Sequence, residues 1–204
     1  IDSIRTIIAS AFELTEAMPN ILEQCLYNIY IDSGWDIVRN VNIYRDSLPE
    51  EYLYPTFTDL CSEIQDYLER SDYSEEVKGN YKGALLSRIR SFANGYKGVL
   101  LNTTAHPDYE ALMTDHCVVE LEGLADDADK CLVMGTILTQ YYQYRRNHFP
   151  DSGEKKKAEH LIVIEEADGT AGRVTEQYDG GNQGVRGRNA DCGSESYKAC
   201  GGCN

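Results

Sequence analysis

The chain has 204 residues, enough for one domain with a substantial core, and 42% of them are apolar, which is typical of a globular rather than a disordered protein. No apolar run approaches the ~20 residues that span a bilayer, and no signal-peptide pattern is present, so we expect a cytoplasmic protein without a membrane segment. The formal net charge of −15 at pH 7 repels nucleic acid and anionic membranes on average, which counts against a DNA-binding module judged by charge alone.

The first part of the chain is predicted to be helical. Apolar residues recur at helical spacing over residues 4–17 and again over residues 21–29. Pro19 lies between these two stripes, where it ends one helix or starts the next because it has no backbone N–H. Gly34 has the position of a C-terminal cap for the second helix. We interpret residues 36–55, which hold two prolines, as a connection.

Two further helices have recognisable starts. Thr56, with an acidic residue three positions later, resembles a capping box and predicts a helix over residues 57–68. Ser74 predicts the start of another helix, which reaches about residue 92. Glycines then break the pattern, and Val99-Leu100-Leu101 predicts a short strand.

The section after residue 116 has the pattern of a βαβ unit. Residues 117–121 and 161–164 are short apolar runs, which we interpret as buried strands. Between them, residues 126–146 have the spacing of a long helix, with acids near its start and arginines at its end that complement the helix dipole. Strands joined in this way are parallel with a right-handed crossover. We therefore predict an α/β fold in which a mainly helical insertion accompanies a parallel sheet.

Two acids follow directly on the second predicted strand. Glu165 and Glu166 come after Leu161-Ile162-Val163-Ile164, and in open α/β sheets ligands bind beyond the carboxyl ends of the strands. One carboxylate at such a place can hold Mg²⁺ through water, and the other can orient or deprotonate the water that attacks a nucleotide phosphate. The alternative is a solvated strand end without chemistry, because apolar strands that end in acids are common.

Four stretches of the sequence carry a family resemblance. They are Pro55–Leu60, Ala84–Phe92 with Gly95 and Gly98, Val118–Leu124 followed by Asp126, Asp127 and Lys130, and Val163–Ala167. Together they resemble the HerA-type helicase and translocase ATPases, relatives of FtsK, over roughly residues 1–167. The resemblance implies a partial P-loop NTPase fold of the RecA/FtsK type in which Glu165 is the metal-side acid of Walker B and Glu166 the catalytic base. A His usually follows this motif in the family, whereas Asp168 stands here.

The resemblance also implies ligands and partners. Intact members of the family use Mg²⁺ and ATP, form a homo-oligomeric ring, act on double-stranded DNA and work with a nuclease partner. A ring can concentrate basic residues on its pore face, so the acidic average charge does not exclude such a motor. Arg88 and Arg90 would face the phosphates of a neighbouring subunit; the alternative is a solvated helix face or a salt-bridge pair.

The sequence contains no G-x-x-x-x-G-K-[ST] motif. That loop supplies the backbone N–H groups and the Lys that hold phosphates. In the family the loop precedes the region that matches Ile1, and Ile1 is not a Met, so we expect the natural start to lie upstream and this chain by itself to bind little or no ATP. The leading interpretation is a fragment of an ATP-hydrolysing subunit. The alternative is a non-catalytic, degenerate ATPase-like subunit that binds partners through its helical surface.

The last part of the chain changes in character. Residues 168–204 are rich in Gly, Asn and Cys and have little apolar periodicity. We therefore divide the chain into three parts: a helical part over residues 1–110, the βαβ unit over residues 111–167, and this tail. Read one nucleotide later with freely chosen synonymous codons, residues 181–204 give EIRAYGEEMLIVDQNPTKLAEDA, which resembles the helix end, apolar strand and Gln-Asn-Pro turn that follow Walker B in the family. We therefore predict a frameshift near Ala167 and a disordered, out-of-frame tail.

The seven cysteines fall into two groups. Three lie in the tail, where three thiols make an incomplete tetrahedral set and where the frameshift accounts for them, so we expect no zinc site. Those three are Cys192, Cys200 and Cys203. The other four lie in apolar stretches, and we expect them to be small buried residues in a reducing cytosol. These are Cys25, Cys61, Cys117 and Cys131.

Overall fold

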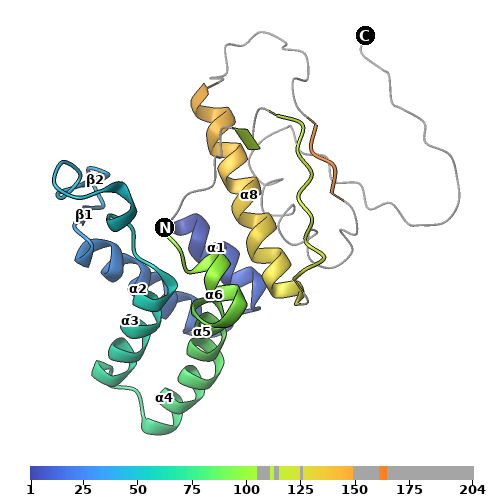
Figure 1. Cartoon of the computed structure of the whole chain (residues 1–204). Helices are drawn as coiled ribbons and strands as arrows, with labels where there is room; N and C mark the ends of the chain where they lie inside the picture. The colour runs from blue at the N-terminus through green and yellow to red at the C-terminus, as the bar shows by residue number, and fades with distance from the viewer. Residues whose placement is uncertain (105–110, 113–114, 125, 149–160, 165–204) are drawn as a thin grey trace, which may run out of the picture. The chain divides into compact units, whose positions relative to one another are not determined.

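A computed structural model of the chain describes residues 1–104, 111–112, 115–124, 126–148 and 161–164. The chain divides into two compact units, Ile1–Lys157 and Ala158–Asn204, and all the helices and strands described below belong to the first. Figure 1 shows them coloured along the chain. Among the described residues, no helix combines the length and the apolar character that crossing a bilayer requires.

The described part of the first unit is mostly helical, with one small antiparallel sheet (Figure 1). The elements are α1 (Asp2–Ala11), α2 (Met18–Asp32), β1 (Trp35–Asp36), β2 (Val41–Asn42), the 3-10 turn η1 (Glu50–Tyr52), α3 (Phe57–Arg70), α4 (Glu75–Tyr81), the π-helical segment η2 (Lys82–Leu86), α5 (Ser87–Ala93), α6 (Gly95–Leu101) and α8 (Asp127–His148).

The helix boundaries predicted at Pro19, Gly34, Thr56 and Ser74 are confirmed, whereas the first helix, predicted over residues 4–17, ends at Ala11. Pro19 lies in the first turn of α2, and Gly34 follows the last residue of that helix with a φ of 89°, which glycine adopts without steric cost. Thr56 and Asp59 form the complete capping box of α3: the Thr56 amide donates to Asp59 Oδ2 over 2.7 Å, and the Asp59 amide donates back to Thr56 Oγ1 over 3.4 Å. Ser74 caps α4 by accepting a bond from the Val77 amide.

The core lies between α1, α2, α3 and the helix that runs through η2 and α5. Its fully buried side chains come from the apolar stripes that the sequence predicts, and the burial of each such side chain contributes about 1.5–3 kcal/mol. They include Ile8, Leu22, Ile64, Leu68, Leu85, Ile89 and Phe92, all at 0% exposure. The rings of Phe12 and Phe57 each lie 5.3 Å from that of Phe92, which closes the core beneath α5.

The helix predicted from residue 75 to about residue 92 contains an irregularity. Residues 82–86 are π-helical, between the α-helical turns of α4 and α5. Gly79 and Gly83 lie in this region, and a methyl group added to either would meet no other atom within 4 Å. The Ser87 hydroxyl donates to the Gly83 carbonyl oxygen. Exposed glycines and a hydroxyl bonded back to the preceding turn make this the weakest part of the long helix.

Residues 36–55, predicted as a connection, contain a short hairpin. β1 and β2 pair antiparallel, with Trp35 opposite Asn42. The indole N–H of Trp35 donates to the Leu53 carbonyl over 2.7 Å, and its ring lies 5.2 Å from that of Tyr54. Asn42 is only 2% exposed, and its side-chain amide donates to the Ser33 carbonyl over 2.9 Å. The Asn42 bond fastens the hairpin to the C-terminal end of α2, and the Trp35 bond fastens it to the end of η1.

Helix α8 confirms the long helix predicted over residues 126–146, but its buried face is different. Leu132 is buried as predicted, whereas Tyr142 is 42% exposed. Asp129 is also buried, and three further buried positions, Cys131, Gly135 and Thr139, are four residues apart and therefore lie on one stripe of the helix. Because these side chains are small, α1 packs closely against α8 here.

Two predictions of local structure are wrong. The strand predicted over residues 99–101 is the last turn of α6. Cys117 is exposed, while Cys25, Cys61 and Cys131 are buried as predicted. The apolar run from Cys117 forms no strand in the described residues, and neither does the run over residues 161–164. The parallel sheet and the P-loop NTPase class therefore stay predictions.

Candidate functional site

The two predicted catalytic acids, Glu165 and Glu166, lie outside the described residues, as do Cys192, Cys200 and Cys203 of the tail. The residues just before the acids are described, and their apolar side chains are exposed: Leu161 by 83% and Val163 by 73%. In the described part of the chain, no three His, Cys, Asp or Glu side chains gather in a way that suits a metal ion. The other predicted members of the site, Arg88 and Arg90, lie within the described residues.

Arg88 is bound within the chain. Its guanidinium donates to the carbonyl oxygen of Phe12 over 2.9 Å and lies 5.8 Å from the centroid of the Phe12 ring. Phe12 is the C-cap residue of α1, where carbonyl groups lack helical partners and attract cations. Arg88 thus joins α5 to the end of α1, and its charge is already engaged.

Arg90 lies two residues further along α5 and points to a different side of the helix. It is exposed, and within the described ranges it has neither a hydrogen bond nor an ion pair. It borders an open depression of about 530 Å³ at the junction of α5 and α6, together with Ser91, Asn94 and Lys97. Burial raises the pKa of the nearby Cys61 thiol, and the charge of Arg90 partly offsets that rise. Of the two predicted arginines, Arg90 is the one available to an anion.

A buried ion pair lies next to this depression. Lys97 Nζ on α6 is 2.5 Å from Asp129 Oδ2 on α8, and the Asp129 side chain is only 1% exposed. That oxygen has no hydrogen bond in the described residues besides this ion pair. The Tyr96 hydroxyl donates to the Gly123 carbonyl over 3.3 Å, a second link from α6 to the start of α8. The sequence offers no signal for this pair, because Asp129 fits equally well as an acid that stabilises a helix start.

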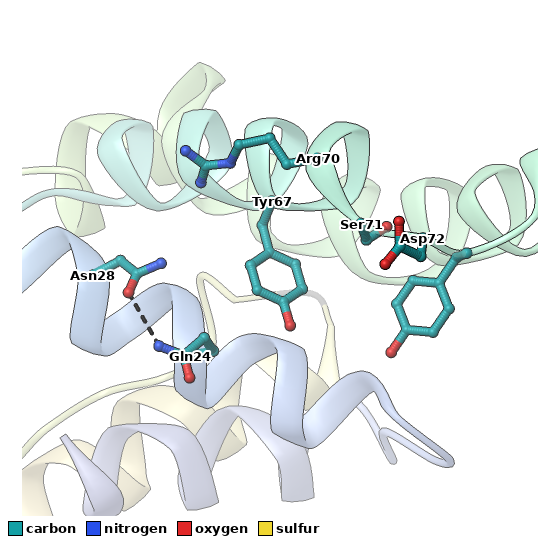
Figure 2. A pocket seen from close by; sticks show the side chains of 7 residues that line it. Gln24, Asn28, Tyr67, Arg70, Ser71 and Asp72 are labelled. Carbon is teal, nitrogen blue, oxygen red and sulfur yellow. Dashed lines mark hydrogen bonds between the residues drawn. The ribbon is translucent and has the colours of Figure 1, made fainter.

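A larger depression of about 710 Å³ lies between α2 and α3. Figure 2 shows Gln24 and Asn28 on α2 facing Tyr67 on α3, with Arg70 and the residues after it along one edge. Its polar groups bind one another: Gln24 donates to Asn28 over 3.1 Å, Asn28 donates to Glu63 over 2.7 Å, and Arg70 is 3.1 Å from the same carboxylate. This network stabilises the helix pair, and its two charged groups, Glu63 and Arg70, are paired with each other.

No protein-family model, curated protein or solved structure matches this chain. The resemblance to HerA-type ATPases therefore rests on the residues that carry it. The structure distinguishes the two predicted arginines: Arg88 is bound to the Phe12 carbonyl, whereas Arg90 has no partner among the described residues.

Proposed function

We propose that the chain is part of an ATP-hydrolysing, HerA-like DNA helicase or translocase subunit. The observation that carries the proposal is the order of three features: the apolar run at residues 117–121, the long helix α8, and the run at residues 161–164 followed directly by Glu165 and Glu166. In a parallel βαβ unit this order brings both acids to the edge of the sheet where nucleotides bind.

The two acids divide the chemistry in this proposal. Glu165 holds Mg²⁺, mostly through water, and Glu166 orients the water that attacks the terminal phosphate and accepts its proton. Phosphate binding itself comes from a loop encoded upstream. The ring, the double-stranded DNA, the nuclease partner and the cytoplasmic location belong to the same proposal and come with the family resemblance.

Exposed apolar side chains support an incomplete sheet. Val118 is 85% exposed and Leu161 is 83% exposed, although both lie in apolar runs that are typical of central strands. Large apolar side chains gathered in an exposed segment usually indicate a missing partner surface. In this proposal, neighbouring strands of a larger domain would cover them.

Nucleotide sequencing and an ATPase assay test the proposal. The DNA upstream of the codon for Ile1 is expected to encode a G-x-x-x-x-G-K-[ST] loop in frame. Codons after that for Ala167 are expected to permit the shifted reading. The full-length protein with that loop and the in-frame tail is then assayed for ATP hydrolysis with and without duplex DNA. Glu166→Gln is expected to lower the rate about 10²- to 10⁴-fold, as the loss of a general base does.

The same assay includes a matched control. Glu76→Gln changes an exposed carboxylate of α4 and is expected to leave the rate unchanged. Equal rates for wild type and Glu166→Gln would remove Glu166 from the base role. A full-length gene without the phosphate-binding loop would favour the alternative, a degenerate ATPase-like subunit that only binds partners.

A further inference from the structure

The segment from β1 to η1 carries exposed apolar side chains and carboxylates; its two arginines, Arg39 and Arg45, are paired with Asp36 and Asp46. The exposed patch comprises Val38, Ile43, Leu48 and Tyr52, which are 96%, 68%, 43% and 67% exposed, together with the carboxylates of Glu50 and Glu51, and we name it the hairpin patch. Within the described ranges neither carboxylate has an ion-pair partner. Exposed apolar side chains concentrated in so short a stretch indicate a binding surface.

Helix α6 carries a second exposed patch of the opposite charge. Tyr96, Val99 and Leu100 are 57%, 79% and 54% exposed, and their spacing of three and four residues places them on one side of the helix. Arg90 borders the same helix and has no ion-pair partner within the described ranges. We name these four residues the α6 face.

The charge around the α6 face is unusual for this chain. Residues 77–104 contain five Lys and Arg residues and no Asp or Glu, although acids outnumber bases 34 to 19 in the whole sequence. Lys78, Lys82 and Lys97 are paired with carboxylates outside this stretch, and Arg88 binds the Phe12 carbonyl, which leaves Arg90 as the free charge of the stretch among the described residues. An apolar surface with one available cation suits an apolar surface with available carboxylates.

We propose that the hairpin patch of one copy of this chain docks on the α6 face of the next copy. Both patches are exposed within a single chain, so they do not cover each other. A symmetric contact of either patch with itself would bring like charges together: carboxylates in one case and guanidinium groups in the other. The head-to-tail contact instead joins Glu50 and Glu51 to Arg90.

This contact has a definite consequence for assembly. A head-to-tail interface uses two different surfaces, so it produces a closed ring when its rotation closes and an open chain when it does not. The two patches would be the contact surfaces of the ring proposed above. Closure of the ring rests on that proposal, whereas the contact itself does not. Few side chains take part, while stable interfaces bury about 800 Å² on each partner, so we expect association in the ~micromolar range that weakens as salt rises.

Sedimentation velocity without nucleotide tests the contact. The protein concentration is varied from about 1 to 100 μM, because the expected dissociation constant lies in this range. Wild type is expected to associate reversibly. Leu48→Ser with Tyr52→Ser blocks the hairpin patch, and Val99→Ser with Leu100→Ser blocks the α6 face. Each pair of changes is expected to weaken association about tenfold or more, because the lost apolar contact is central.

The matched control is Ile31→Ser, which removes an exposed apolar side chain of α2 outside both surfaces and is expected to associate like wild type. The decisive sample mixes the two blocked variants. Each retains the surface that the other has lost, so the mixture is expected to stop at pairs of one copy each.

Three results would overturn the inference. Wild type could remain monomeric throughout, the mixture could remain monomeric, or one blocked variant could associate as strongly as wild type. A titration with a labelled single-stranded oligonucleotide covers the other class of partner. Binding that the α6-face variant loses, with wild type monomeric, would assign this face to nucleic acid instead. No sample in this experiment contains ATP, so its results do not test ATP hydrolysis. A loss of hydrolysis in the ATPase assay, in turn, does not test this contact.

Discussion

The close approach of α1 and α8 allows a sharp test of the packing. A methyl group added to Gly135 on α8 would lie 2.9 Å from Cγ2 and 3.2 Å from Cγ1 of Ile7, which is only 7% exposed. Ile7 is β-branched, and in a helix its χ1 angle has one strongly preferred value, so its side chain cannot turn aside. We predict that Gly135→Ala destabilises the protein.

The size of the effect follows from two opposing contributions. Alanine is more favourable than glycine inside a helix by about 1 kcal/mol. Forcing an extra methyl group into a packed contact costs about 1–3 kcal/mol. The expected net loss is therefore about 1 kcal/mol. Gly79→Ala has only the first contribution, because an added methyl group there meets no atom within 4 Å, and it should stabilise by about 0.5–1 kcal/mol.

Urea denaturation followed by circular dichroism at 222 nm measures both variants. A rescue variant, Gly135→Ala with Ile7→Ala, removes the contact, and in that background the Gly135 change should become neutral or stabilising. The reasoning fails if Gly135→Ala stabilises the chain as much as Gly79→Ala does. It also fails if truncating Ile7 leaves the cost of the Gly135 change unaltered.

Three further predictions follow from other contacts. Lys97→Met should destabilise the protein by about 3 kcal/mol because it leaves the buried Asp129 carboxylate without its ion-pair partner. Asp129→Asn should cost less, because Lys97 is 29% exposed and can reach water. Equal losses of stability in thermal unfolding would contradict this prediction. Thr56→Ala should cost about 1–2 kcal/mol through the lost cap, and helix α3 should then show faster amide exchange at its start. Burial raises the pKa of the Cys25 thiol from 9.0 to about 12. The contribution of this thiol to stability is therefore complete below pH 9 and is lost as the pH rises toward 12. A thiol reagent at pH 8 should label the exposed Cys117 rapidly and the buried Cys25 only on unfolding.

Local signals account for what the sequence predicted well. The capping box of Thr56 and Asp59, the cap at Ser74 and the turn at Gly34 each depend on residues a few positions apart, so the sequence alone specifies them. The apolar stripes of α2 and α3 likewise depend only on spacing, and the structure buries them as expected.

Packing between helices explains what the sequence did not predict. Three apolar residues at 99–101 fit a strand as well as a helix, and what favours the helix is the packing of α6 against α5. A methyl group on Gly98 would lie 2.5 Å from the Ala93 carbonyl oxygen, so only glycine fits this close turn. The pairing of Asp129 with Lys97 has the same character, since neither residue shows its partner in the sequence. The roles of Glu165 and Glu166 depend on a parallel sheet that the described residues do not form, so those roles stay predictions.

The one tryptophan of the chain gives the hairpin an optical reporter of its own. Trp35 is hydrogen-bonded to the Leu53 carbonyl and lies against the ring of Tyr54, so its emission follows the local state of the hairpin, while the dichroism signal follows the helices. Any ligand that settles on this part of the molecule should shift that emission before the helices respond. Binding isotherms can therefore be recorded on the unmodified protein, without attaching a dye.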